Sequence, residues 1–285
     1  MISRHTAEVL LDRSRQRSVW LAPESIPLLL IGIVAGAVIA RPDWLGENSL
    51  AAFLLPQAVL LSILVWLWRR TRLQKRTSYL ATAVWEAIRL KDWPQAESLV
   101  SELLARPIRS FATRAQSLMA LVAVAEEQQQ YDAAQHVLEA ILMDPQTNAG
   151  QRFVAQVALA GTLLRTQQLT DAVNLIERLA RVGLPEPLRA QIELLSLLRY
   201  VVMGQTDDAV AQADERCAMF RRHLGTRAGY GYGLLSVAFD RAGQPERAAA
   251  YWRDATLLLR ADEIVHRFAE AQPVAEKYPA TEWPL

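Results

Sequence analysis

Residues 93–107 read WPQAESLVSELLARP, residues 131–145 read YDAAQHVLEAILMDP and residues 169–183 read LTDAVNLIERLARVG. The three stretches align without gaps at a period of 38 residues. The matched positions are an opening large residue (Trp93, Tyr131, Leu169), an alanine (Ala96, Ala134, Ala172) and a closing Pro or Gly (Pro107, Pro145, Gly183). Two looser copies, TDDAVAQADERCAMF and PERAAAYWRDATLLL, place Ala209 and Ala248 at the same point. A repeat of this size predicts stacked helical hairpins, with the alanine where two helices cross.

The sequence between these copies supports the same fold class. From Thr77 onward apolar residues recur at helical spacing, and Gly, Pro or Asp interrupts them roughly every 15 to 20 residues. This pattern predicts short helices and no strands. We therefore expect an all-α protein with about five helical hairpins over residues 77–266, followed by a C-terminal tail over 267–285.

Composition excludes several functions. The 285 residues carry 31 cations and 30 anions, so net charge gives no reason to expect a nucleic-acid partner. Cys217 is the one cysteine, which rules out an intramolecular disulfide and a thiolate metal site. The four histidines form no pair at i, i+4. We predict no catalytic residue, no metal ligand and no cofactor, and therefore not an enzyme.

A glycine-rich run, Gly229 to Gly233, is the one motif that suggests a nucleotide site. It follows a helical segment instead of a strand, and no Lys-Ser/Thr pair comes after it. We expect it to allow a close approach between helices at the start of the fifth hairpin.

The first 76 residues contain two apolar runs, which predict a transmembrane helical hairpin. The run from Ile26 to Ala40 has 15 uncharged residues and covers about 22 Å as a helix, so we extend the first span to residues 26–45. The second run, residues 50–68, has 19 residues and covers about 28 Å. The ridge of Gly32, Gly36 and Ala40 suits close packing of the two spans or of two copies of the chain, or its glycines simply fill the helix.

Flanking charges predict the orientation. Four Arg precede the first span in a basic arm over residues 1–25, one Arg lies in the short loop, and five cations follow the second span in a basic segment over 69–76. Both ends are therefore expected in the cytoplasm of a multi-pass inner-membrane protein. An alternative is a cleaved signal peptide that ends at Ala40. The expected membrane-interface residues are Trp44, Trp66, Trp68, Arg69, Arg70, Arg72, Lys75 and Arg76.

The hairpin pattern resembles the tetratricopeptide repeat, in which an aromatic residue follows the turn and a second helix opens with alanine and ends at proline. The matching residues are Trp93, Tyr131, the five alanines, Gly204, Gly243, Tyr200, Phe239 and the terminal prolines. Lys91, Gln129 and Gln167 replace glycine at the turn in the first three copies. The two spans, the basic exit WLWRR and AIRLKDWPQAESL also resemble HemY-type membrane proteins, which are encoded beside haem-biosynthesis enzymes.

The resemblance implies that the first helix of each hairpin lines a groove for a protein or peptide partner. Carried over to this chain, the groove positions are Ala81, Trp85, Arg89, Met119, Glu126, Val157, Leu164, Arg165, Leu194, Leu198, Tyr230, Val237 and Asp240. These side chains are also expected if they only seal neighbouring hairpins together. The expected function is a membrane-anchored scaffold with a membrane-associated partner. The alternatives are an envelope-assembly or secretion adaptor with the repeats outside, and a haem-pathway role.

Overall fold

The computed structural model describes residues 2–15, 49–108 and 110–279, and within these ranges it contains helices and turns but no strand. The helices divide into two compact units, residues 1–151 and 152–285. The expectation of an all-α protein is confirmed.

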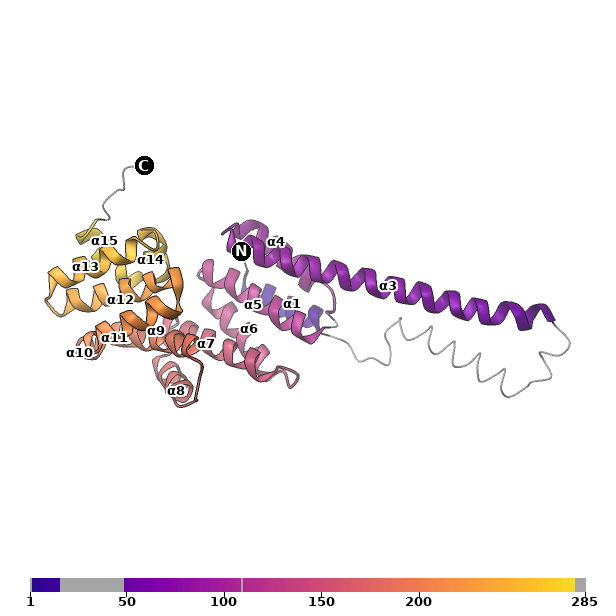
Figure 1. Cartoon of the computed structure of the whole chain (residues 1–285), viewed down its shortest axis with the longest axis horizontal. Coiled ribbons are helices and arrows are strands. Elements are labelled where there is room, and N and C mark those ends of the chain that lie inside the picture. The colour runs from indigo at the N-terminus through magenta and orange to yellow at the C-terminus, as the bar shows by residue number, and fades with distance from the viewer. Residues whose placement is uncertain (1, 16–48, 109, 280–285) are drawn as a thin grey trace. The chain divides into compact units, whose positions relative to one another are not determined.

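The first unit is built around α3, a helix of 41 residues from Ser49 to Arg89. Its C-terminal part pairs with α4 (Trp93–Leu104) as the first hairpin, and α5 (Phe111–Glu127) pairs with α6 (Tyr131–Met143) as the second. A separate N-terminal helix, α1 (Arg4–Ser14), packs against α6 and α4 (Figure 1). The stretch expected to be a basic arm therefore includes a helix that belongs to the unit.

The second unit continues the same pattern. Its first helices are α7 (Ala149–Arg165), which begins just before the unit boundary, α9 (Glu186–Val202) and α12 (Ala228–Arg241). Its second helices are α8 (Leu169–Ala180), the pair α10 (Thr206–Val210) and α11 (Ala213–His223), and α13 (Pro245–Thr256). The remaining elements are the 3-10 turns η3 (Gly225–Arg227) and η4 (Ala269–Ala271), and the short helices α14 (Ala261–Arg267) and α15 (Gln272–Lys277).

The five repeat alanines are all fully buried in the second helices of the hairpins. Ala96, Ala134, Ala172, Ala209 and Ala248 each have 0% of their surface exposed. In the fifth hairpin Ser236 of α12 donates a hydrogen bond of 2.6 Å to the carbonyl of Ala248 in α13, which shows how closely the two backbones approach. A larger side chain would force the helices apart. The complete burial of the five alanines is what the repeat predicts, and in the fifth hairpin the alanine also lies where the two helices meet.

The five hairpin turns share one backbone geometry. Lys91, Gln129, Gln167, Gly204 and Gly243 are all left-handed, with φ between 57° and 71°. In each turn the next backbone N–H donates to a carbonyl five residues earlier, as from Asp92 to Ala87 at 2.9 Å. This is the Schellman ending of a helix, which normally uses glycine. The Lys and Gln residues that replace glycine therefore occupy the same conformation as glycine does in the last two hairpins.

The second helix of the fourth hairpin is broken, although the repeat predicts one continuous helix from residue 206 to 220. Gln212 is left-handed, with φ of 56°, and it separates α10 from α11. The buried guanidinium of Arg216 donates to the carbonyls of Asp208, Ala209 and Ala211 at 2.7–2.9 Å. It also pairs with Glu193 of α9 at 2.6 Å. Arg216 thus satisfies carbonyls that the end of α10 leaves without helical partners.

The glycine run in α12 lies against neighbouring side chains. A Cβ atom on Gly231 would lie 2.3 Å from the Phe220 ring of α11, and one on Gly233 would lie 2.8 Å from Ile264 of α14. Both distances are too short for a real side chain. The expectation that this run permits close helix packing is confirmed.

Candidate partner-binding surfaces

The N-terminal half of α3 exposes a continuous apolar surface. Leu60, Leu61, Leu64 and Val65 are each more than half exposed, and Trp68 is 61% exposed. At 100° per residue these side chains cover well over a third of the helix circumference. Exposed apolar surface of this extent is typical of surfaces that bind protein or membrane. In Figure 1 this half of α3 extends beyond α4 and α5.

Length and hydropathy criteria for a bilayer-crossing helix are not met by any helix in the described part of the chain, and this includes the described residues of α3, which contains the second predicted span over residues 50–68. The first predicted span, residues 26–45, lies outside the described residues, as do Trp44 and the small residues Gly32, Gly36 and Ala40. The side chains of Trp66, Arg69 and Arg70 are also outside what the structure describes.

The described cations that follow the apolar run have different partners. Arg72 lies over the Trp68 ring, 5.2 Å from its centroid, and Lys75 is exposed. Arg76 forms a salt bridge of 2.7 Å with Glu102 of α4. The first hairpin therefore begins within the same helix that carries the apolar surface, and no linker separates them.

In the first unit, the predicted groove positions lie on α3 and α5. Trp85 is 42% exposed and Arg89 is exposed, whereas Ala81, Met119 and Glu126 are half-buried. The indole of Trp85 is thus a large apolar side chain that the described part of the first unit leaves partly open to solvent.

In the second unit, most apolar groove positions are part of the core. Leu164, Leu198 and Val237 are buried, and Val157 and Leu194 are half-buried against the same cluster. These residues hold neighbouring hairpins together. Their burial fits the alternative to a groove, in which these side chains only seal neighbouring hairpins together.

The chain's own C-terminal segment, residues 261–278, covers the remaining predicted positions of the second unit. Tyr230 donates a hydrogen bond of 3.0 Å to Glu263 and meets the Phe268 ring edge-on at 5.6 Å. The Arg165 guanidinium lies over that same ring at 5.9 Å. Burial and the nearby Glu263 carboxylate raise the pKa of Tyr230 to about 12.

Asp240 is held by the end of the same segment. It accepts hydrogen bonds from Lys277 at 2.6 Å and from Tyr278 at 2.9 Å. The Lys277 ammonium holds the pKa of Asp240 below its ordinary value. Phe268 and Val274 are buried although the sequence assigned both to a tail that began at residue 267. They complete the core of the fifth hairpin, so the second unit extends past that predicted boundary.

Burial of three apolar side chains makes the C-terminal segment costly to displace from the second unit. Ile264, Phe268 and Val274 are at most 5% exposed, and each is worth about 1.5–3 kcal/mol when fully buried. A partner that displaced this segment would first have to overcome roughly 5–9 kcal/mol. The Trp85 surface of the first unit requires no such displacement.

A pocket of about 460 Å³ lies between α11 and α13, with Tyr232 of α12 in its wall. Cys217 and Tyr251 line it, but burial raises the pKa of the Cys217 thiol to about 11 and that of the Tyr251 hydroxyl to about 12. Neither group is ionised near neutral pH, so the pocket offers no activated nucleophile. Within the described ranges, no group of three or more His, Cys, Asp or Glu could hold a metal ion.

The helix α1 was not predicted from the sequence, although its residues carry a local signal. Ala7, Leu10, Leu11 and Ser14 recur at the spacing of one helix face, and all four are buried. Ser3 caps the helix, because its side chain accepts a hydrogen bond from the backbone N–H of Thr6 at 3.1 Å. This stripe and its cap were the available signal.

Comparisons of the chain with protein-family models, with curated proteins and with solved structures found no match. A functional proposal therefore depends on the residues and geometry described above.

Proposed function

We propose that the chain is a membrane-anchored scaffold of the tetratricopeptide-like type, whose first hairpins bind a protein or peptide partner close to the membrane surface. The proposal is carried by one observation, that a single helix contains both the surface proposed to meet the membrane and the surface proposed to bind the partner. α3 contains the exposed apolar surface in its first half and the exposed Trp85 in its second half.

The geometry of α3 limits where such a partner would be. Trp68 and Trp85 are 17 residues apart in one helix, which corresponds to about 25 Å along the axis. With Trp68 at the membrane interface, as its aromatic ring and the cations after it suggest, a partner on Trp85 would lie within about 25 Å of the lipid. A client that is itself membrane-associated fits this distance.

The orientation in the proposal comes from the flanking charges. One cation, Arg41, lies near the connected ends of the two predicted spans, whereas four Arg precede the first span and five cations follow the second. This asymmetry favours a cytoplasmic location for the repeats in a bacterial inner membrane. The HemY-type resemblance suggests a haem-pathway client. An adaptor with its repeats outside the cell remains the alternative.

Photocrosslinking in intact membranes tests the partner surface. A photoreactive phenylalanine analogue replaces Trp85 in one variant and Leu90 in the control. Leu90 is also exposed and lies just after α3, but it is not a predicted groove position. The proposal expects a defined crosslinked protein from position 85 that mass spectrometry identifies, weak crosslinking from position 90, and loss of capture in Trp85→Asp but not in Leu90→Asp. Equal crosslinking from both positions would refute the partner surface.

A further inference from the structure

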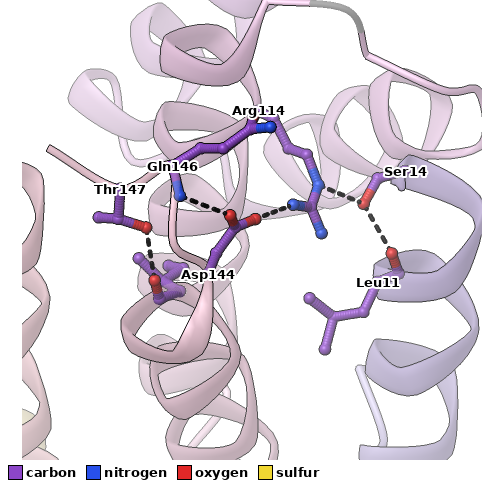
Figure 2. Close-up of polar contacts among 7 residues, drawn as sticks. Leu11, Ser14, Arg114, Asp144, Gln146 and Thr147 are labelled. Carbon is purple, nitrogen blue, oxygen red and sulfur yellow. Dashed lines mark hydrogen bonds and ion pairs between the residues drawn. The ribbon is translucent and has the colours of Figure 1, made fainter. Parts of the chain in front are cut away.

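Both ends of helix α1 form hydrogen bonds with other parts of the first unit. At its start, the backbone N–H of Ile2 donates a hydrogen bond of 2.7 Å to the side chain of Gln128, at the end of α5. At its end, Ser14 accepts from the backbone of Ile108 through its carbonyl and from Arg114 through its hydroxyl, both at 3.3 Å. Figure 2 shows this second contact, in which Arg114 also reaches Asp144.

Between these ends α1 buries one face and exposes the other. Ile2, Ala7, Leu10 and Leu11 are at most 6% exposed, while the outer face carries Arg4, His5, Glu8, Asp12 and Arg13. An isolated helix of 11 residues is marginal in water. α1 is therefore helical because it packs on α4 and α6, and it belongs in the same compartment as these helices.

This contact constrains the path of the chain, given the membrane anchoring proposed above. If the first half of α3 crosses a bilayer, then α4 and α6 lie on the side that its C-terminal half enters. α1 packs on α4 and α6, so it must lie on that side too. The chain between Arg15 and the second half of α3 must then cross an even number of times. The sequence predicts the other crossing in the run from Ile26 to Ala40, which lies outside the described residues.

We infer that α1 acts as a clasp, meaning that it holds the N-terminal end of the predicted membrane hairpin against the first two repeats. We also infer that α1 is retained in the working protein. Cleavage after Ala40 would remove α1, expose the apolar surface beneath it and take Ser14 away from Arg114. The clasp thus favours an intact hairpin over the cleaved signal peptide. It also ties the two ends of the hairpin to one folded unit.

Single-cysteine labelling tests the shared compartment. In a Cys217→Ala background, one cysteine is placed at Arg4, at Ala149 or at Asn48, which lies in the loop predicted between the spans. Sealed cells are treated with a membrane-impermeant maleimide before and after they are opened. The inference expects positions 4 and 149 to be protected together and position 48 to be labelled from outside. Labelling of positions 4 and 149 from opposite sides, or loss of residues 1–40 from the mature chain, would overturn it.

Hydrogen exchange on the purified full chain tests the clasp independently of the membrane. The amides of α1 should exchange on the order of 100-fold more slowly than in a free peptide of the same sequence. Leu11→Asp should remove that protection, whereas Arg13→Asp, which adds the same group on the exposed face, should keep it. Fast exchange in the unaltered chain would refute the clasp. A chain with protected α1 that is recovered only from the soluble fraction would refute the proposed anchoring and leave the clasp intact.

Discussion

The Nε atom of Arg114 donates a hydrogen bond to the Oγ atom of Ser14, 3.3 Å away, across 100 residues of sequence (Figure 2). The same guanidinium pairs with Asp144 at 2.7 Å, and its side chain is only 10% exposed. Asp144 in turn accepts from the backbone N–H of Gln146 at 3.0 Å. One buried cation thus joins the end of α1 to the loop after α6.

Arg114→Ala should destabilise the first unit by about 3–5 kcal/mol, because it leaves Asp144 without its buried partner. Ser14→Ala should cost less, about 1–3 kcal/mol, because it removes the hydrogen bond that the hydroxyl donates to Leu11 and the one that it accepts from Arg114. Hydrogen exchange of the α1 and α6 amides in the full chain, followed at increasing denaturant concentration, measures the loss of stability in both variants. The control is Arg189→Ala, which breaks an exposed pair with Glu186 and should cost less than about 1 kcal/mol. Equal losses of stability in Arg114→Ala and Arg189→Ala would mean that the buried contacts of Arg114 do not stabilise the first unit.

Gly231→Ala should destabilise the second unit by about 1–3 kcal/mol, because the new methyl group would collide with Phe220. The change adds helix propensity worth up to about 1 kcal/mol, so the expected loss is a net effect against that gain. Denaturant unfolding measures it. Gly183→Ala is the matched control, since no atom lies within 4 Å of its added Cβ, and it should be close to neutral. A stabilising Gly231→Ala would show that the helices do not approach this closely.

Gln167→Gly should stabilise the chain by roughly 0.5–1 kcal/mol, although it removes a side chain. The left-handed conformation of a non-glycine residue costs about 1–2 kcal/mol, which exceeds the backbone entropy that glycine loses on folding. Gln168→Gly, one position later, has no left-handed strain to relieve and should destabilise by a similar amount. Thermal unfolding compares the two variants. Loss of stability in both would argue against the left-handed turn.

Cys217 should react slowly with thiol reagents until the pH is high. Its pKa of about 11, against an ordinary value of 9.0, makes the thiolate fraction at pH 8 about 100-fold smaller than in the unfolded chain. Above pH 9 the unfolded chain loses this proton and the folded chain keeps it, so the contribution of Cys217 to stability is lost as the pH rises towards 11. Reaction rates with a disulfide reagent between pH 7 and 11, with and without urea, provide the measurement. Equal folded and unfolded rates at pH 8 would contradict the burial of Cys217.

The hairpins could be predicted from the sequence because their geometry depends on local, repeated residues. A fixed alanine at each helix crossing and a turn at constant spacing leave a period that one sequence reveals. The left-handed Lys91, Gln129 and Gln167 align with Gly204 and Gly243, so the repeat also identifies the turns without glycine.

Three features were not predicted, because the stability of each depends on a distant partner. α1 is helical through its packing on α4 and α6, and its own 11 residues carry little helical stability. The break at Gln212 is stabilised by Arg216, which also requires Glu193 from another helix. Burial of Phe268 requires Tyr230 and Arg165 to be in place. For the same reason the sequence could not show that part of the predicted groove is covered.

Membrane extraction tests the central proposal most directly. Membranes that contain the full chain are washed with alkaline carbonate and then with detergent, beside a variant with Leu61→Arg and Leu64→Arg on the exposed face of α3. Each charge within a span should cost about 2.5–3.5 kcal/mol of insertion. We predict that the unaltered chain resists carbonate and is released only by detergent, while the double variant is released largely by carbonate. Complete release of the unaltered chain by carbonate would contradict the membrane anchor.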